Sequence, residues 1–416
     1  MNIPAIYYKN NEDYVTIPAI KNFMHNHPDG QFKISQPRED LMNQIITYAE
    51  KENKEEIVYD WLDEVIQEGI KDIYIEQAIL DEKLRLIFSS EKDINNYLTQ
   101  FVNKTYNKHI CLNEYNENFI LINAYYSIDN LGKKVVFIYC KKLRMHDKKK
   151  QATKIIDYPV TAEYYIERGW LLVRAKPRSN LYIYNSQEFN IEYAISTTTD
   201  KQIKEVVGFV KETLKLEKSD KVACINKLKN SVFNLLHKYT NTPVDILNVM
   251  ESNKDNINKL SNSIYSLCNN SEQCAIPKSM QEDIEKDINN IVEKYLSINW
   301  KDKQIFIQDR EAYPVKLSAT DEEESKVEQS AALLEPLQTK ALFFDNKKML
   351  YKSKQCDGIV LQWKRKNPAF FADDSFRVKI YVNTKGYCIF KFSEYTSKDD
   401  IENVILSLIG SETNIK

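Results

Sequence analysis

The stretch Trp170-Leu171-Leu172-Val173-Arg174-Ala175-Lys176-Pro177-Arg178 shows the pattern on which the fold prediction depends. Side chains alternate along an extended chain, so Arg174, Lys176 and Arg178 are expected on one face, about 6.5 Å apart, with Val173 and Ala175 opposite. Further β-rich runs lie between about residues 118 and 195, separated by turn-forming or charged segments. The sequence therefore predicts an antiparallel β-rich block in this region.

Four blocks of different character follow one another along the 416 residues. Residues 1–106 are predicted to form an acidic, mainly helical module, and residues 107–199 a β-rich basic module. Residues 200–300 are predicted to be a helical middle segment. Residues 301–416 are predicted to be a β-rich basic module that closes with a helix over about residues 398–409. The predicted fold class is α+β, with helical and antiparallel β-rich blocks in alternation.

Three local assignments belong to this prediction. Ile73, Ile75 and Ile79 are included in the helical pattern of the first block. Leu342-Phe343-Phe344 is assigned to a β-run that Asp345 ends. The segment Cys140–Lys150 is interpreted as a basic loop at a sheet edge, following a strand over residues 135–139.

A strand-like ending runs into Ser, Thr or Asp and then a helix at three places, near residues 195–200, 317–321 and 392–397. These side chains accept hydrogen bonds from the free amides of a helix, and acids suit its positive end. One interpretation is a duplication that gives two related α-then-β halves. The other is that every strand-to-helix junction needs a cap, so the three resemble each other by chemistry alone.

Composition excludes several classes of site. The chain has eight glycines, and the closest two, Gly386 and Gly410, are 24 residues apart. Glycine-rich phosphate loops, dinucleotide fingerprints and nucleophile elbows need closer glycines. Seven scattered cysteines without a CxxC pair argue against a zinc knuckle or a secreted disulfide framework. With no visible signal peptide or membrane-spanning run, we expect a cytoplasmic protein without a membrane partner and without a cofactor.

Charge is distributed unevenly, although the whole chain has a net charge of only −2. Residues 37–93 contain 16 acidic against 7 basic residues, a net charge of −9. Residues 141–154 contain 7 basic residues and one acid, and residues 345–391 contain 11 basic and 4 acidic residues. The basic segments suggest contact with phosphates, whereas the acidic helices suggest a protein partner.

Three groups of side chains are candidates for nucleic-acid binding. The first is the basic loop, the second is the β-run of the opening stretch, and the third interleaves cations with aromatic rings, as single-strand binders do. The candidates are Lys141, Lys142, Arg144, Lys148, Lys149, Lys150, Arg174, Lys176, Arg178, Trp363, Lys364, Arg365 and Lys366. The alternative is that these are solvated charges and that lysines on an edge strand prevent aggregation.

A catalytic alternative rests on four residues. The sequence contains an acid, a second acid and a lysine in that order. They are Glu335 in a helical stretch, Asp345 at a strand end and the lysine of Gln362-Trp363-Lys364 in the next β-run. This order resembles metal-dependent nucleases of the PD-(D/E)xK type, with glutamine in place of the more common acid. The resemblance implies a divalent cation held by carboxylates and a lysine that orients water.

Other metal candidates are weaker. The segment around Pro28 is typical of a turn and contains His25, His27 and Asp29. The remaining histidines form no HExxH motif. The acidic run Asp321–Glu324 is interpreted as the first turn of a helix. We therefore predict no metal site. The leading hypothesis is a non-catalytic nucleic-acid-binding or accessory protein of a larger complex. The nuclease is the first alternative, and a protein–protein scaffold is the second.

Overall fold

The computed structural model describes residues 14–101, 117–149, 151–185, 194–270, 277, 279–320, 326–368, 371 and 373–410. The chain divides into two compact units. Unit 1 comprises residues 1–225 and 365–410, and unit 2 comprises residues 226–364 with the last six residues. Unit 1 takes helices or strands from all four of the blocks predicted from sequence.

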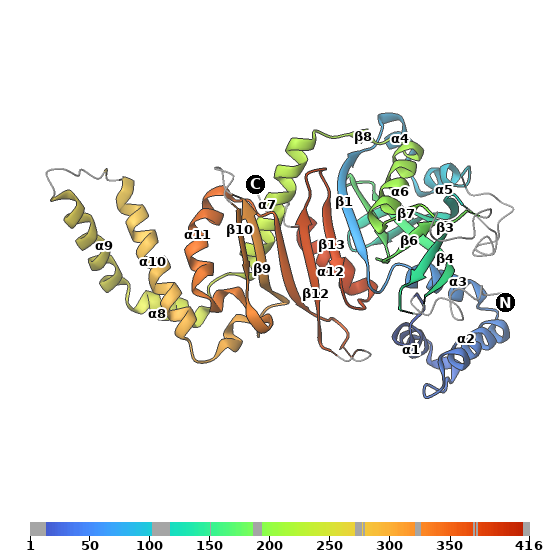
Figure 1. The fold of residues 1–416 in the computed structure, drawn as a ribbon, viewed down its shortest axis with the longest axis horizontal. Coiled ribbons are helices and arrows are strands. Elements are labelled where there is room, and N and C mark those ends of the chain that lie inside the picture. Colours follow the sequence, from blue (N-terminus) through green and yellow to red (C-terminus); the bar gives the residue numbers. More distant parts are fainter. Residues whose placement is uncertain are drawn as a thin grey trace. The chain divides into compact units, whose positions relative to one another are not determined.

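Unit 1 contains an antiparallel sheet in the strand order β12-β13-β1-β5-β4-β3-β6-β7 (Figure 1). Strand β2 pairs with β3, and β8 pairs with β1. The strands are β1 Asp72–Ile79, β2 Ile120–Asp129, β3 Gly132–Asp147, β4 Ala152–Tyr165, β5 Trp170–Ala175, β6 Leu181–Ile183, β7 Ser196–Thr197, β8 Glu217–Lys218, β12 Ser375–Val382 and β13 Cys388–Phe392.

Helices cover both faces of this sheet. They are α1 Ile17–Asn26, the 3-10 helix η2 Pro28–Gly30, α2 Arg38–Glu52, α3 Glu55–Val65, α4 Glu82–Ile87, α5 Glu91–Leu98, α6 Thr199–Thr213 and α12 Lys398–Ile409. One apolar core includes Phe137 and Val173 of the sheet with Val206 of α6. A second core joins α1, α2 and α3 to the opposite side chains of β2 and β3, such as Val136 and Ile138.

Helix caps account for where two of these helices begin. Thr198 precedes α6, and its hydroxyl accepts a hydrogen bond from the Lys201 amide at 3.2 Å. Ser397 precedes α12 and accepts from the Asp400 amide at 3.2 Å. Both caps lie at predicted strand-to-helix junctions. At the third junction, residues 321–325 lie outside the described residues, and Lys326–Ser330 form a strand that pairs with strand β9, Ala312–Thr320. Whether the two α-then-β halves are related stays a prediction.

Unit 2 combines a bundle of helices with a three-stranded antiparallel sheet in the order β10-β9-β11. Its helices are α7 Lys221–Tyr239, which starts just before the unit boundary, α8 Val244–Ser252, α9 Lys254–Asn269, α10 Ser279–Asn299, α11 Ala341–Ser353 and the 3-10 helices η5 Lys303–Phe306, η6 Ala332–Leu334 and η7 Leu337–Thr339. Its strands are β9 Ala312–Thr320, β10 Lys326–Ser330 and β11 Gly358–Lys364.

The α+β class and the closing helix are confirmed, but all three local assignments need correction. Ile73, Ile75 and Ile79 belong to the strand β1, which lies between β13 and β5. Leu342-Phe343-Phe344 and Asp345 lie inside helix α11, not in and at the end of a strand. Residues 140–147 continue strand β3, so the predicted basic loop shrinks to the turn after Asp147. Short apolar runs fit either a buried strand or a buried helix, and packing decides between them.

None of the helices in the described parts of the chain combines the length and the apolar character that crossing a lipid bilayer requires.

Candidate functional site: a buried ionic layer and a basic hairpin tip

Arg174 is the basic residue of β5, and the face of the sheet on which it lies is not open to solvent. Strand β5 lies between β1 and β4, and Arg174 is only 2% exposed. Lys176, just beyond the strand, is 8% exposed, and Arg178 is half-buried. The prediction of a solvent-facing basic edge strand is therefore wrong. The physical reason is that β5 is a central strand whose two faces are both covered.

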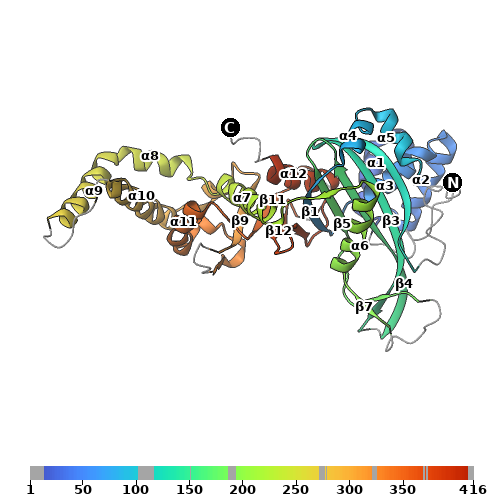
Figure 2. The same ribbon diagram turned by 90° about the horizontal axis from the view of Figure 1, so that it is seen from above.

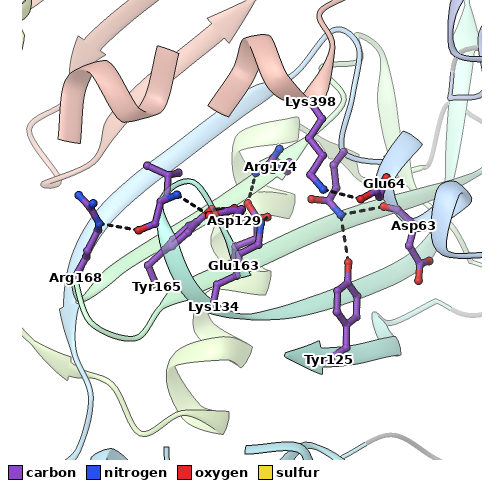
Figure 3. Close-up of polar contacts among 12 residues, drawn as sticks. Asp63, Glu64, Tyr125, Asp129, Lys134, Glu163, Tyr165, Arg168, Arg174 and Lys398 are labelled. Carbon is purple, nitrogen blue, oxygen red and sulfur yellow. Dashed lines mark hydrogen bonds and ion pairs between the residues drawn. The ribbon is translucent and has the colours of Figure 1, made fainter. Parts of the chain in front are cut away.

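A buried ionic layer surrounds Arg174 (Figure 3). The Arg174 guanidinium pairs with the carboxylate of Glu163, which is fully buried on the neighbouring strand β4. The other carboxylate oxygen of Glu163 lies 2.6 Å from Lys134 Nζ of β3, and Lys134 Nζ also lies 2.6 Å from Asp129 Oδ2. The hydroxyl of Tyr165 donates to the same Asp129 oxygen at 2.8 Å. Charges on the four adjacent strands β2, β3, β4 and β5 thus compensate one another inside the fold.

The electrostatics of Glu163 follow from this arrangement. Burial by itself raises the pKa of the Glu163 carboxyl, but Arg174 and Lys134 outweigh it and hold the pKa at about 2. Burial likewise opposes the charge on Lys134, yet Glu163 and Asp129 keep the pKa of its ammonium group above the usual value. Glu163, Lys134 and Arg174 are therefore all charged at neutral pH, and each charge is stabilised by its oppositely charged neighbours.

Two further lysines extend the layer toward the start of β1. Register places Lys71 beside Lys176, because Asp72 and Ala175 are the adjacent Cα partners of β1 and β5. The Nζ atoms of Lys71 and Lys176 lie 5.3 Å and 5.5 Å from the centre of the Tyr14 ring. Lys71 is 2% exposed, and its Nζ donates to the carbonyl of Ile66 at the end of α3. Burial lowers the pKa of Lys71 well below its usual value, and Lys176, Arg174 and Arg178 lower it further.

Several buried polar atoms of this layer have no hydrogen-bond partner among the described residues. They are Nε and Nη1 of Arg174, Oγ1 of Thr161 and Oε1 of Glu402. Thr161 is the direct Cα partner of Arg174 across β4 and β5, so the two side chains adjoin on one face. Glu402 of α12 lies within electrostatic range of Arg174. Unsatisfied buried groups are uncommon in folded proteins and call for an explanation.

A second group of polar contacts lies under α3 (Figure 3). The Asn123 amide donates to Asp63 Oδ2 at 2.9 Å, and the Gln67 amide lies 3.4 Å from the hydroxyl of Tyr125. At its margin Lys398 Nζ contacts Glu64 Oε1 at 2.8 Å. These contacts tie α3 to strand β2 and α12 to α3.

The first predicted basic cluster separates into paired and exposed members. Lys141 is buried and contacts Glu205 at 2.7 Å, and Lys142 contacts Asp157 at 3.1 Å. Arg144 is buried as well and donates to the carbonyl of Asn185 at 2.7 Å. Lys148 and Lys149 are exposed in the turn between β3 and β4. Lys150 lies outside the described residues.

We define the hairpin tip as the turn after Asp147 with the adjoining ends of β3 and β4. Lys148, Lys149 and Lys154 are its exposed described cations. Its acid, Asp147, accepts a hydrogen bond from the Lys149 amide at 2.9 Å, which shapes the turn. Figure 2 shows the far end of β4 next to β7, at the opposite end of the unit 1 sheet from α4 and α5. The tip therefore presents positive charge on a two-stranded ribbon.

The second basic region is also mostly engaged in structure. Trp363 is fully buried, with its ring 5.4 Å from that of Tyr239, so the prediction that it stacks on bases is wrong. Lys364 Nζ donates to the carbonyls of Ile307 and Gln308 at 2.9 and 2.8 Å. Arg365 lies over the Phe371 ring at 4.1 Å with its side chain 4% exposed. Lys366 is exposed.

The residues of the nuclease alternative do not have the predicted setting. Asp345 lies in helix α11 and pairs with Lys294 at 2.5 Å, whereas that type of nuclease needs the acid at a strand. Glu335 follows the 3-10 helix η6 and pairs with Lys340. Gln362 is buried in β11, next to the paired Lys364. Over the described part of the chain, no group of three or more His, Cys, Asp or Glu side chains could hold a metal ion.

The histidine segment forms a capped turn. His27 Nδ1 lies 2.9 Å from the Phe23 carbonyl, and its ring stacks on Phe23 at 4.2 Å. Asp29 accepts from the Tyr48 hydroxyl at 2.7 Å and from Lys54 Nζ at 2.6 Å. The run Asp321–Glu324 lies outside the described residues. The cysteines Cys224, Cys268, Cys356 and Cys388 are free thiols.

The sequence prediction missed Lys71, Lys134, Glu163 and Thr161. Lys134 and Glu163 carry a signal that could have been used, because each occupies a position in a strongly apolar alternating strand that faces a core. A charge at such a position predicts an opposite charge on the next strand. Their pairing itself depends on strand order, which no local pattern contains.

No protein-family model matches this chain, and no curated protein is significantly similar to it. The hairpin tip and the ionic layer are therefore the features from which a function is inferred.

Proposed function

We propose that this protein binds the phosphate backbone of nucleic acid through the hairpin tip, without sequence preference and without catalysis. The observation that carries the proposal is the exposure of Lys148, Lys149 and Lys154 at the end of the paired strands β3 and β4. A two-stranded ribbon fits the major groove of a duplex, and lysines that contact phosphates release counterions. Among the basic surfaces predicted from the sequence, the hairpin tip has several exposed cations on one β-hairpin.

The frame behind the tip supports this role. Arg144 bonds to the Asn185 carbonyl and lies over the Tyr184 ring, with 5.5 Å between the guanidinium carbon and the ring centre. His146 Nδ1 lies 3.0 Å from Thr153 Oγ1 across the two strands. These contacts hold the ribbon in one geometry, so that less conformational entropy is lost when the tip contacts phosphates.

An accessory role is the second part of the proposal. The acidic side chains of α2 and α3 lie on exposed faces of these helices, and they are Glu39, Asp40, Glu50, Glu52, Glu55, Glu56 and Asp60. Such a surface repels phosphate, which favours a basic protein surface as its partner. In this proposal the tip contacts nucleic acid while α2 and α3 contact another component of the complex.

Salt dependence of binding tests the proposal. Affinity for short duplex DNA, duplex RNA and single strands is measured by fluorescence anisotropy at several salt concentrations. Replacing Lys148, Lys149 and Lys154 with alanine should reduce the slope of log affinity against log salt by about 2 to 3, because each lost phosphate contact contributes about 0.7 to 0.9. The melting temperature should change little, because exposed charges contribute little stability.

A matched control changes the net charge by the same amount elsewhere. Lys51, Lys83 and Lys92 are exposed on the helices and turns of the acidic region. Their triple alanine variant should keep the slope of the unmodified protein. Equal slopes for the unmodified protein and the tip variant, with both proteins folded, would contradict the proposal.

A further inference from the structure

The helices α9 and α10 of unit 2 pack along each other, and we refer to them together as the helical arm. Figures 1 and 2 show α10 between α9 and α11, so α10 has neighbours on two sides, whereas the main neighbour of α9 is α10. Of the 16 residues of α9, Ile257 and Ser261 alone are buried. Two helices bury only the seam between them, so any further apolar side chains of the arm need another layer to cover them.

Polar contacts line one side of the seam between α9 and α10. The Gln281 amide donates to Asn262 Oδ1 at 3.0 Å, and Glu285 acts electrostatically on Lys254. The two pairs follow each other in opposite directions along the two helices, so α9 and α10 are antiparallel. They also establish which residues of the two helices lie at the same level of the arm.

Apolar side chains line the other side of the seam on α9. An α-helix turns by about 100° per residue, so side chains three, four or seven positions apart share a side. By this spacing Asn262 lies on one side of the buried Ile257, and Leu260 lies on the other together with Ile264 and Leu267.

Helix α10 repeats this division. Ile288 is buried, and the same spacing places Glu285 on one side of it and Ile284 on the other. Polar contacts therefore mark one side of the arm, and apolar side chains from both helices mark the other. We refer to this second side as the apolar face, and its members are Leu260, Ile264, Leu267, Met280, Ile284 and Ile291.

The apolar face is open to solvent in the described structure. Leu260 is 50% exposed, Leu267 74% and Ile291 48%. Ile264 and Ile284, which lie closer to the seam, are half-buried. Single exposed apolar side chains are common in soluble proteins, but a row of them along two neighbouring helices marks an interaction surface.

The charges of the two helices indicate what covers this face. Helix α10 contains five acids and two lysines, whereas α9 contains two lysines and one acid. If α10 of one copy packs on α9 of a second copy, a two-fold axis repeats the contact and opposite net charges meet both times. Packing α10 on α10 would instead bring the acids of the two copies together.

One pair of side chains shows this complementarity in detail. Lys259 of α9 and Asp283 of α10 are exposed, and each lies beyond the apolar face on the side away from the seam. The level of the Asn262–Gln281 contact places them at nearly the same level of the arm. Asp283 contacts Lys286 of its own helix at 3.5 Å, and more than half of each of these two side chains stays exposed.

We infer that the apolar face is a homodimer interface, in which α10 of each copy packs on α9 of the other to complete a four-helix bundle. Each arm supplies two antiparallel helices that are apolar on a common side, and two such pairs enclose a core. The inference goes beyond the proposed contact with nucleic acid, because the arm shares no residue with the hairpin tip or with α2 and α3.

Sedimentation velocity of the full chain tests this inference. Between about 1 and 100 µM, the chain should shift from monomer to dimer as its concentration rises. Replacing both Leu260 and Ile291 with glutamine should weaken dimerisation by about 100-fold, because the two-fold axis removes four apolar side chains from the interface. The melting temperature of the monomer should change little, because both side chains already contact water.

The matched control replaces two exposed apolar residues of unit 1. Leu86 is 77% exposed and Ile128 is 62% exposed, and neither belongs to the arm. The variant with both residues changed to glutamine loses as many apolar side chains as the arm variant. It should dimerise like the unmodified protein.

An exchange of charges tests the arrangement of the helices. Lys259→Glu alone and Asp283→Lys alone should each weaken dimerisation by about 10-fold, because each places like charges opposite each other twice in the dimer. The variant that carries both changes restores opposite charges and should dimerise like the unmodified protein. This recovery distinguishes a direct contact between copies from a general effect of net charge.

Three results would overturn the inference. The first is a chain that stays monomeric at about 100 µM, which would assign the apolar face to a different protein. The second is a Leu260→Gln, Ile291→Gln variant that dimerises like the unmodified protein. The third is a stronger dimer for Asp283→Lys alone, or no recovery in the double charge variant. Loss of DNA binding in the tip variant bears on the proposed function alone.

Discussion

Glu163→Gln should destabilise unit 1 strongly, because it removes the negative charge shared by Arg174 and Lys134. Glutamine preserves the volume of the side chain, so packing around β4 stays nearly unchanged. Two buried cations then lose their counter-charge, and breaking a buried ion pair in this way costs about 3 to 5 kcal/mol. The pKa of Glu163 leads to a similar figure. The difference between its usual value of 4.5 and about 2 corresponds to about 3 kcal/mol of stability.

The loss of stability caused by Glu163→Gln should also depend on pH, and it should become smaller as the pH falls. A carboxyl whose pKa is lowered by folding contributes its full stability above its unfolded pKa and loses it as pH falls through its folded pKa. Above about pH 5, the free energy of unfolding of the unmodified protein should therefore exceed that of Glu163→Gln by the full difference. The difference should shrink between pH 4.5 and about 2, the usual and the folded pKa of this group.

Urea unfolding followed by tryptophan fluorescence measures this difference. Trp170 is buried in β5 and reports on unit 1, once Trp300 and Trp363 of unit 2 are replaced by phenylalanine. Glu167→Gln is the matched control, because Glu167 pairs with Lys133 at 3.4 Å and both side chains are more than half exposed. The control should lose less than about 1 kcal/mol. A loss below about 1 kcal/mol for Glu163→Gln, or a loss that is the same at pH 3 and pH 7, would refute this account of the ionic layer.

Three shorter predictions concern the fold. Ser397→Ala removes the cap of α12 and should lower the free energy of unfolding of unit 1 by about 1 kcal/mol, measured by urea unfolding; an unchanged value would show that the cap contributes nothing. Trp363→Ala should destabilise unit 2 by about 3 to 5 kcal/mol in the same assay while DNA affinity of the folded protein stays constant, because the ring is fully buried. Deleting residues 1–106 should abolish cooperative unfolding of unit 1 in calorimetry, because β1 pairs on both sides with β13 and β5; a retained transition would contradict the central place of β1.

Local chemistry was enough to predict part of this fold. The closing helix was expected over about residues 398–409 and α12 occupies Lys398–Ile409, because a serine cap and an amphipathic repeat are written in adjacent residues. The extended state of residues 170–175 follows from alternation alone. In each case every residue that decides the outcome lies within one element.

For two segments the sequence pattern was ambiguous, and their secondary structure depends on the elements that pack or pair with them. Residues 72–79 contain isoleucines at spacings that fit either periodicity, and they form a strand because β13 and β5 supply hydrogen bonds on both edges. Leu342-Phe343-Phe344 are helical, with Phe343 and Phe344 buried in unit 2. Hydrogen-bond partners that are far apart in sequence decide such cases, and no window of sequence includes both.

The sequence by itself determined the α+β class, two helix caps and the extended state of β5. Only the tertiary structure decided that Arg174 of this strand is buried, because the covering helices come from segments far away in the chain. The same arginine that alternation assigned to a solvent-facing phosphate contact became a partner of Glu163. Charge and periodicity specify what a side chain can do, whereas the strand order and the helices packed on the sheet specify what it meets.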